Sequence, residues 1–191
     1  MEKINQQTKT NKPTNQQTKT MAMLPDNYQI PAASGNYIKL VPGDTKLRIL
    51  CPPIMGEEGW RDKPGGGSEV VRVPWGEKLP AGLRDIKHFW ATVAWDFGDS
   101  QIKIWSIGQK TIQFELVGLI RNVEWGDLTL YNITVGRQGS LRDDTKYKIT
   151  PSPRSEAPPE ALAALKANPV NLQALFSGED PFASVKEEMP F

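Results

Sequence analysis

Basic and aromatic side chains alternate with apolar ones along three short stretches of this sequence. The alternating residues are Lys46 and Arg48 in the first stretch, His88 and Trp90 in the second, and Lys103 and Trp105 in the third. If each stretch is a β-strand, every second side chain lies on the same face of a sheet. Indole rings stack on unpaired bases, at about 1–3 kcal/mol per base, and Lys and Arg neutralise phosphates. The pattern therefore predicts a surface for single-stranded nucleic acid.

A long segment between the first two stretches, residues 52–86, is rich in proline and glycine and contributes residues of the same two kinds. We expect it to be an extended excursion with one short strand at 70–73, and its acidic pair Glu57-Glu58 to lie in a solvated loop. Together with Lys87, which follows the segment, the predicted DNA-binding set is Lys46, Arg48, Trp60, Arg61, Arg72, Trp75, Lys87, Trp90, Lys103 and Trp105. The alternative for Trp60, Trp75, Trp90 and Trp105 is core packing, which is the role that we assign to Trp95 and Trp125.

The residues of common catalytic and metal sites are scarce in this chain. His88 is the only histidine and Cys51 the only cysteine, which excludes a structural zinc site built from His and Cys. A Ser/His/Asp triad would have to use His88, which lies within an aromatic run. The GGGSE sequence at 65–69 lacks the spacing of a phosphate-binding loop. The sequence therefore predicts neither an enzyme nor a cofactor.

Hydrophobic periodicity predicts the elements that hold these residues. Alternation indicates strands at 45–51, 88–97, 102–107, 131–135 and 146–150. Between the third and fourth strands, residues 109–120 repeat with a helical period, and the apolar face is Ile112, Leu116, Leu119 and Ile120. Short helices are expected at 159–167 and 170–176.

Three strands, a helix and two strands is the order of an OB-fold, a five-stranded Greek-key barrel. The predicted fold is all-β with one helix, with a disordered N-terminal arm and an acidic C-terminal tail. The predicted interior residues are Leu47, Ile49 and Cys51; Phe89, Ala91 and Val93; and Ile102 and Ile104. The predicted regions are a disordered basic arm (1–23), the OB-fold domain (24–155), a linker with short helices (156–178) and the acidic tail (179–191).

Charge is distributed unevenly between the two ends of the chain, although the net charge is only +1. Lysines dominate residues 1–23, which contain NQQTKT twice, and carboxylates dominate residues 178–191. The N-terminal extension is either dispensable or a basic arm that contacts a polyanion or a neighbouring protomer. The chain ends in Glu187, Glu188, Met189, Pro190 and Phe191, an acidic string with an apolar tip.

A single cysteine indicates a reducing compartment. The sequence has no run of about 18 apolar residues and no apolar secretory region at its N-terminus. We therefore expect a cytoplasmic protein.

Several motifs, taken in order, resemble the single-stranded DNA-binding proteins of tailed bacteriophages. They are YIKLVPGDTKLRILCPPIMG, KHFWATVAW, IGQKTIQ, EWGDLTLYNITV, YKITPSP and LQALFSGEDPF, and the likeness covers roughly residues 36–182. The resemblance implies an OB-fold that coats exposed strands during replication, recombination and repair in the bacterial host. Two departures are the absence of a zinc site, which some replicative phage proteins of this functional class carry, and the Asn/Gln/Thr/Lys arm.

The ending EEMPF is similar to the acidic tip of bacterial single-stranded DNA-binding proteins, which docks replication and repair enzymes. This likeness implies that Glu187, Glu188, Pro190 and Phe191 recruit such partners. The protein also has the potential to self-associate on DNA. Two other interpretations remain open: an OB-fold that binds RNA, and an interaction module that binds protein.

Overall fold

The computed structural model describes residues 35–139 and 144–183. The chain divides into two units, Met1–Ala33 and Ser34–Phe191, and every described residue belongs to the second. The predicted basic arm (1–23) and the tip residues Glu187, Glu188, Pro190 and Phe191 lie outside the described residues.

The described part of the chain is mostly β and contains few helices. One antiparallel sheet has seven strands, so the predicted number of five was wrong. The strands are β1 (Gly43–Ile49), β2 (Ile54–Asp62), β3 (Ser68–Pro74), β4 (Arg84–Asp96), β5 (Gln101–Ile107), β6 (Tyr131–Gln138) and β7 (Lys146–Arg154). The two additional strands are β2 and β3, which occupy the segment expected to be a loop with one short strand.

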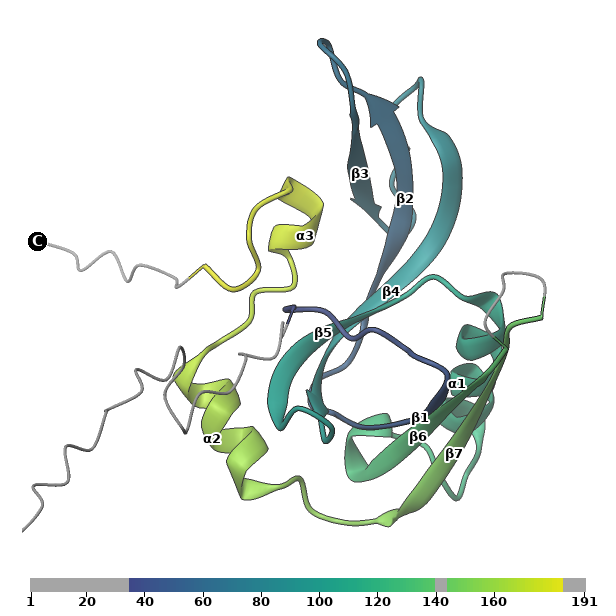
Figure 1. Ribbon diagram of the computed structural model, residues 1–191, viewed down its shortest axis with the longest axis vertical. Coiled ribbons are helices and arrows are strands. Elements are labelled where there is room, and N and C mark those ends of the chain that lie inside the picture. The colour runs from purple at the N-terminus through teal and green to yellow at the C-terminus, as the bar shows by residue number, and fades with distance from the viewer. Residues whose placement is uncertain (1–34, 140–143, 184–191) are drawn as a thin grey trace, which may run out of the picture. The chain divides into compact units, whose positions relative to one another are not determined.

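The strand order is β3-β2-β4-β1-β6-β7, with β5 paired to the other edge of β4. In this order β3, β5 and β7 each have one strand neighbour, so the sheet does not close on itself. Figure 1 shows β2, β3 and the first half of β4 extending beyond the other strands. We call β2, β3 and Arg84–His88 of β4 the arm sheet.

Glycines 65–67 form the turn between β2 and β3. All three have positive φ, from 82° to 102°, a conformation that glycine adopts at little steric cost. The backbone N–H of Lys63 donates to the carbonyl of Gly67 at 3.0 Å. The glycine run in the expected excursion is therefore the turn of a β-hairpin.

Helix α1 (Lys110–Arg121) confirms the helix predicted at 109–120. Ile112 and Leu116 are fully buried and Leu119 packs against the same core, whereas Ile120 is exposed. A 3₁₀ turn, η1 (Leu128–Leu130), leads into β6. Helix α2 (Pro159–Ala167) has the predicted bounds, and α3 (Ala174–Ser177) is a single turn. No helix in the described ranges is long and apolar enough to cross a bilayer.

Two apolar cores lie on opposite faces of the β4–β5 hairpin. The first core lies against α1 and contains Leu47 and Ile49 together with Trp90 and Trp105. The second contains Phe89, Ala91, Val93 and Ile104, with Cys51 at its margin. Leu47 and Ile49 are buried as predicted, but their partners on β4 are the even-numbered residues. The register pairs Ile49 with Ala94. Phe89, Ala91 and Val93 are buried as predicted, but in the second core, so both faces of this part of β4 are covered.

The C-terminal segment covers the second core. Leu172, Leu175 and Phe176 from the segment around α3, together with Leu165 of α2, pack onto the β4–β5 face. Phe176 lies 6.1 Å from Phe89, measured between ring centroids. The segment 156–178, expected to be a linker with short helices, thus contains α2 and α3 and packs side chains against the sheet.

Candidate nucleic-acid interface

Positive charge is concentrated on three adjacent strands, β1, β6 and β7. Their sequences contain six basic residues and one carboxylate, that of Asp44. The basic residues are Lys46, Arg48, Arg137, Lys146, Lys148 and Arg154. Strands β2 and β3, in contrast, contain four acidic and two basic residues. A polyanion would therefore be attracted to the β1–β6–β7 sheet more strongly than to the arm sheet.

Strand register shows which side chains share the face of this sheet that points away from the first core. Asp44 lies opposite Gly136, which lies opposite Lys148, and Lys46 lies opposite Thr134, which lies opposite Thr150. Their neighbours in sequence, including Leu47, Ile133 and Val135, are fully buried on the other face. The outward face is therefore polar along these strands, and we call it the β1–β6–β7 face.

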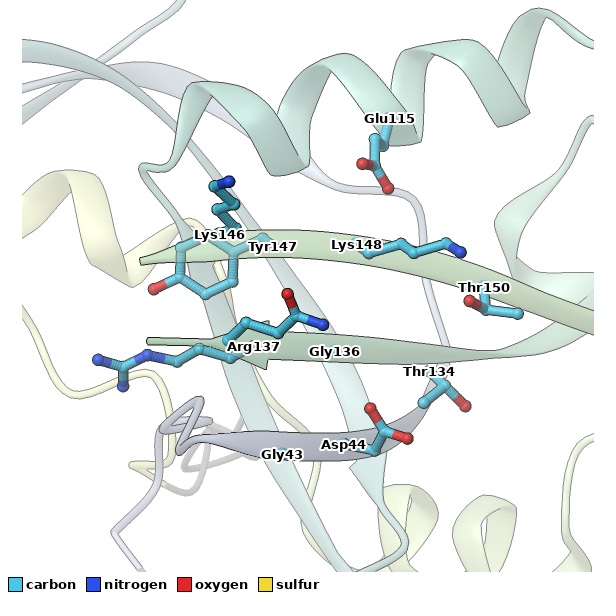
Figure 2. A pocket seen from close by; sticks show the side chains of 11 residues that line it. Gly43, Asp44, Glu115, Thr134, Gly136, Arg137, Lys146, Tyr147, Lys148 and Thr150 are labelled. Carbon is cyan, nitrogen blue, oxygen red and sulfur yellow. The ribbon is translucent and has the colours of Figure 1, made fainter. Parts of the chain in front are cut away.

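A groove of about 950 Å³ lies at one end of these strands (Figure 2), and we call it the basic groove. It is lined by Gly43, Asp44, Glu115, Thr134, Gly136, Arg137, Gln138, Lys146, Tyr147, Lys148 and Thr150. Lys146 and Lys148 are exposed, and Tyr147 is half-buried, with part of its ring against the core. The groove thus combines three cations with one aromatic ring.

Gly136 forms part of the floor of the basic groove. A Cβ atom at this position would lie 3.1 Å from Oδ1 of Asp44 and 3.7 Å from the carbonyl oxygen of Lys148. Glycine within a strand is a common mark of close approach by a ligand or another backbone. The missing side chain keeps the floor open between β1 and β7.

Glu115 of α1 lies at the margin of the groove, where β7 has a free edge. Its carboxylate accepts a hydrogen bond from the backbone N–H of Ile149. An unpaired strand edge is a template for pairing with another chain, so this contact blunts the edge. Glu115 is therefore held by the backbone.

The guanidinium of Arg137 at the groove has a hydrogen-bond donor that is unused among the described residues. Its Nη1 donates to the carbonyl oxygen of Leu40 at 2.6 Å, whereas its Nε is buried and has no partner among the described residues. In the part of the chain that the structure describes, no carboxylate forms an ion pair with Arg137. A guanidinium of this kind can form charge-assisted hydrogen bonds with an anion in the groove.

The cations of the arm sheet, in contrast, are paired with carboxylates. Arg61 pairs with Glu69 at 2.6 Å, and Arg84 pairs with Asp62 at 2.7 Å. Glu58, which is buried on β2, accepts from Arg72 at 2.8 Å and lies 3.1 Å from Lys87. The expectation that Glu57-Glu58 lies in a solvated loop was therefore wrong. Of the predicted DNA-binding set, Arg61, Arg72 and Lys87 belong to this neutralised network.

The four candidate tryptophans have different environments. Trp90 and Trp105 are 6% and 1% exposed, so the prediction that they lie on an open surface was wrong. The indole N–H of Trp90 donates to Nε2 of His88 at 2.8 Å. Trp60 is half-buried, with Nζ of Lys87 4.9 Å from its ring centroid, and Trp75 is 65% exposed.

The three remaining predicted residues also divide between surface and interior. Lys46 is exposed, with its Nζ 4.8 Å from the ring centroid of Phe97. Lys103 is buried and bonded to Asp96 and Asp99. Arg48 is 2% exposed and is covered by the chain at Ser155. Of Lys46, Lys103 and Arg48, only Lys46 is an exposed cation on the β1–β6–β7 face.

The sequence analysis did not single out Arg137, Lys146, Tyr147 or Lys148. A signal was present, because KYKIT alternates basic residues with Tyr147 and Ile149 in the manner of the other stretches. Trp95 and Trp125 pack as predicted: Trp95 is 4% exposed, and Trp125 packs against the first core.

No protein-family model, curated protein or solved structure matches the chain significantly.

Proposed function

We propose that this chain binds single-stranded DNA with little sequence preference through the β1–β6–β7 face. The observation that carries the proposal is the excess of six cations over one carboxylate on three adjacent strands. When such a surface neutralises phosphates, counterions condensed on the nucleic acid are released, which adds affinity without reading the sequence. Tyr147 packs partly against the first core but also lines the basic groove, where its ring is available for a base to stack on.

The order of elements supports an OB-fold as the architecture behind this proposal. Strands β1, β4 and β5, helix α1, and strands β6 and β7 follow the three-strand, helix, two-strand order, and β2–β3 is an insertion. OB-folds bind oligonucleotides on a sheet face and in adjacent loops. The resemblance to phage single-stranded DNA-binding proteins adds the context of replication, recombination and repair in the bacterial cytoplasm.

The proposal includes recruitment of replication proteins by Glu187, Glu188, Pro190 and Phe191, which rests on the sequence alone. The acidic side chains would steer the terminus to a basic pocket. Burial of Phe191 would contribute on the order of 1.5–3 kcal/mol.

Titration with labelled oligo(dT) and with a duplex of equal length, each at several salt concentrations, tests the proposal. We expect tighter binding of oligo(dT), with a log–log salt slope near −0.7 per phosphate neutralised. Equal affinity for an oligo(rU) of the same length would favour the RNA-binding alternative. Absence of salt-dependent binding to any of these would contradict the proposal and favour a protein-interaction module.

A specific observation favours that second candidate: Met55 and Ile86 of the arm sheet are exposed, as is Trp75, which follows β3 and donates its backbone N–H to the carbonyl oxygen of Met55. Exposed apolar side chains that lie close together are typical of protein interfaces. A protein-interaction module would lose partner binding when these residues are replaced by polar ones, and it would keep that binding when the basic groove is altered.

A further inference from the structure

A second cavity lies at the opposite end of β1 and β6 from the basic groove. It has a volume of about 780 Å³, and we call it the Arg48 cavity. Its basic lining residues are Arg48 and Arg154, its apolar walls include Leu130 and Leu162, and Glu156 is its one carboxylate. Thr129 and Ser155 add hydroxyl groups.

Arg48 has no charged partner among the described residues, although it is almost fully buried. Its Nη1 donates to Oδ1 of Asn132 at 3.1 Å and to Oγ of Ser155 at 3.2 Å, and its Nη2 donates to the carbonyl oxygen of Ser155 at 2.5 Å. All of these acceptors are neutral, and Nε has no partner among the described residues. Buried charges are ordinarily paired or bound to a ligand. Burial lowers the pKa of Arg48 from its ordinary value.

The cavity and the groove belong to one face of the sheet. Arg48 lies opposite Asn132 in the register, two residues along from the pair of Lys46 and Thr134. β6 has eight residues, and a strand rises about 3.3 Å per residue, so the two ends of this face are on the order of 26 Å apart. At the groove end, the side chain of Arg137 alternates to the other side of β6, but it lines the groove, and its Nε, like that of Arg48, is buried without a partner among the described residues.

We propose that the Arg48 cavity is a nucleotide subsite that binds one phosphate and the adjoining base of a single strand whose other end occupies the basic groove. Arg48 and Arg154 face the phosphate, and Leu130 and Leu162 contact the base. This inference rests on the proposed function and extends it, because it adds a second anchoring point. The bound strand then follows β6 between the two cavities.

Charge changes at exposed positions of the cavity test this subsite in the full chain. Leu162 is 53% exposed on α2, so Leu162→Glu adds a carboxylate at the cavity without emptying a core, and Leu162→Gln is the matched uncharged control. We expect Leu162→Glu to weaken binding of a 20-nucleotide oligo(dT) about tenfold at low salt. Leu162→Gln should change the affinity less than about threefold, and Glu156→Gln should strengthen binding.

Oligo(dT) of decreasing length adds an independent readout. When a strand is too short to reach from the groove to the cavity, Leu162→Glu and Leu162→Gln should bind it equally well. If the two variants bind the 20-nucleotide strand equally well, while Lys148→Ala still weakens that binding, the subsite is absent and the proposed function stands. If the unaltered chain binds no oligo(dT), the proposed function itself fails.

Discussion

Trp105 and Trp90 show how the environment of an individual side chain decides its role. Both indoles belong to the first core with Leu47 and Ile49, so their contribution is to folding. Trp75, at 65% exposure, is the contrasting case. Residue type suggested the same role for all three, because the sequence does not reveal which face of β4 is covered by α1 and which by α3.

Trp105→Ala is expected to lower the free energy of unfolding by about 3–5 kcal/mol, because it empties a large buried site. Trp75→Ala is the matched control and should change stability by less than about 0.5 kcal/mol. Urea unfolding, followed by circular dichroism, measures both. Equal stability of the two variants would contradict the burial of Trp105.

Gly136 allows a test of the groove floor with little effect on the fold. The nearest obstacle to an added Cβ is the short side chain of Asp44, and its Oδ1 can rotate away. Valine also suits a strand. We expect Gly136→Val to fold with normal stability and to bind oligo(dT) at least about threefold more weakly, because it fills the floor between Asp44 and Lys148. Unchanged affinity in a folded variant would show that the strand does not approach the floor.

The β4–β5 hairpin has a buried ion pair that the sequence did not predict. Nζ of Lys103 lies 2.9 Å from Oδ2 of Asp96, and Asp99 forms a second pair with the same lysine. Burial lowers the pKa of Lys103, but the hydrogen bonds from Lys103 to Asp99 and Asp96 raise it more, so the pKa lies above its ordinary value. Alternation placed Lys103 on a solvated face, where a lysine would need no such partners.

Lys103→Met leaves Asp96 buried without its cation, and we expect a loss of about 3–5 kcal/mol in the free energy of unfolding at pH 7. Because the lysine pKa is higher in the folded state, its contribution is present below the unfolded pKa of about 10.4 and decreases as the pH rises through the folded value. The difference in the free energy of unfolding between Lys103→Met and the unaltered chain should therefore decrease above about pH 10.4.

Urea unfolding at pH 7 and at about pH 11 measures this change. Arg84→Ala, which removes an exposed pair with Asp62, is the control and should cost less than about 1 kcal/mol. If Lys103→Met lowers the free energy of unfolding by the same amount at both pH values, the lysine charge does not have the stabilising role described.

Periodicity predicted most elements well, and the exception has a physical cause. Strands β1, β4, β5, β6 and β7, the helix α1 and the helix α2 were all expected, whereas β2 was not. Gly56 and Gly59 interrupt the alternation in β2. A Cβ on Gly56 would lie 2.8 Å from Phe176 and 2.9 Å from Phe89, and one on Gly59 would lie 3.0 Å from Leu83. Close packing of β2 against these residues therefore requires glycine at both positions. In a sequence, glycines at such positions indicate a loop rather than a strand.

At the scale of the molecule, the two faces of the sheet have different roles. The C-terminal segment covers the outer side of the β4–β5 hairpin, and the β1–β6–β7 face is polar and basic. The sequence predicted a basic binding surface, but besides Lys46 and Arg48 of β1 it placed that surface on β4, β5 and the arm sheet. That assignment could not foresee the carboxylates that pair with Arg61, Arg72 and Lys87, because those contacts are made between strands.

A comparison of two variants tests whether single-stranded DNA binds to the β1–β6–β7 face, as proposed. Lys148→Ala and Arg61→Ala each remove one exposed positive charge, the first from the basic groove and the second from the arm sheet. Oligo(dT) affinity should be measured for both variants and for the unaltered chain over a range of salt concentrations. We expect Lys148→Ala to weaken binding at low salt and to reduce the magnitude of the salt slope by about 0.7, and Arg61→Ala to change neither. Weaker binding and a reduced slope for Arg61→Ala, with Lys148→Ala indistinguishable from the unaltered chain, would contradict the claim and place the strand on the arm sheet.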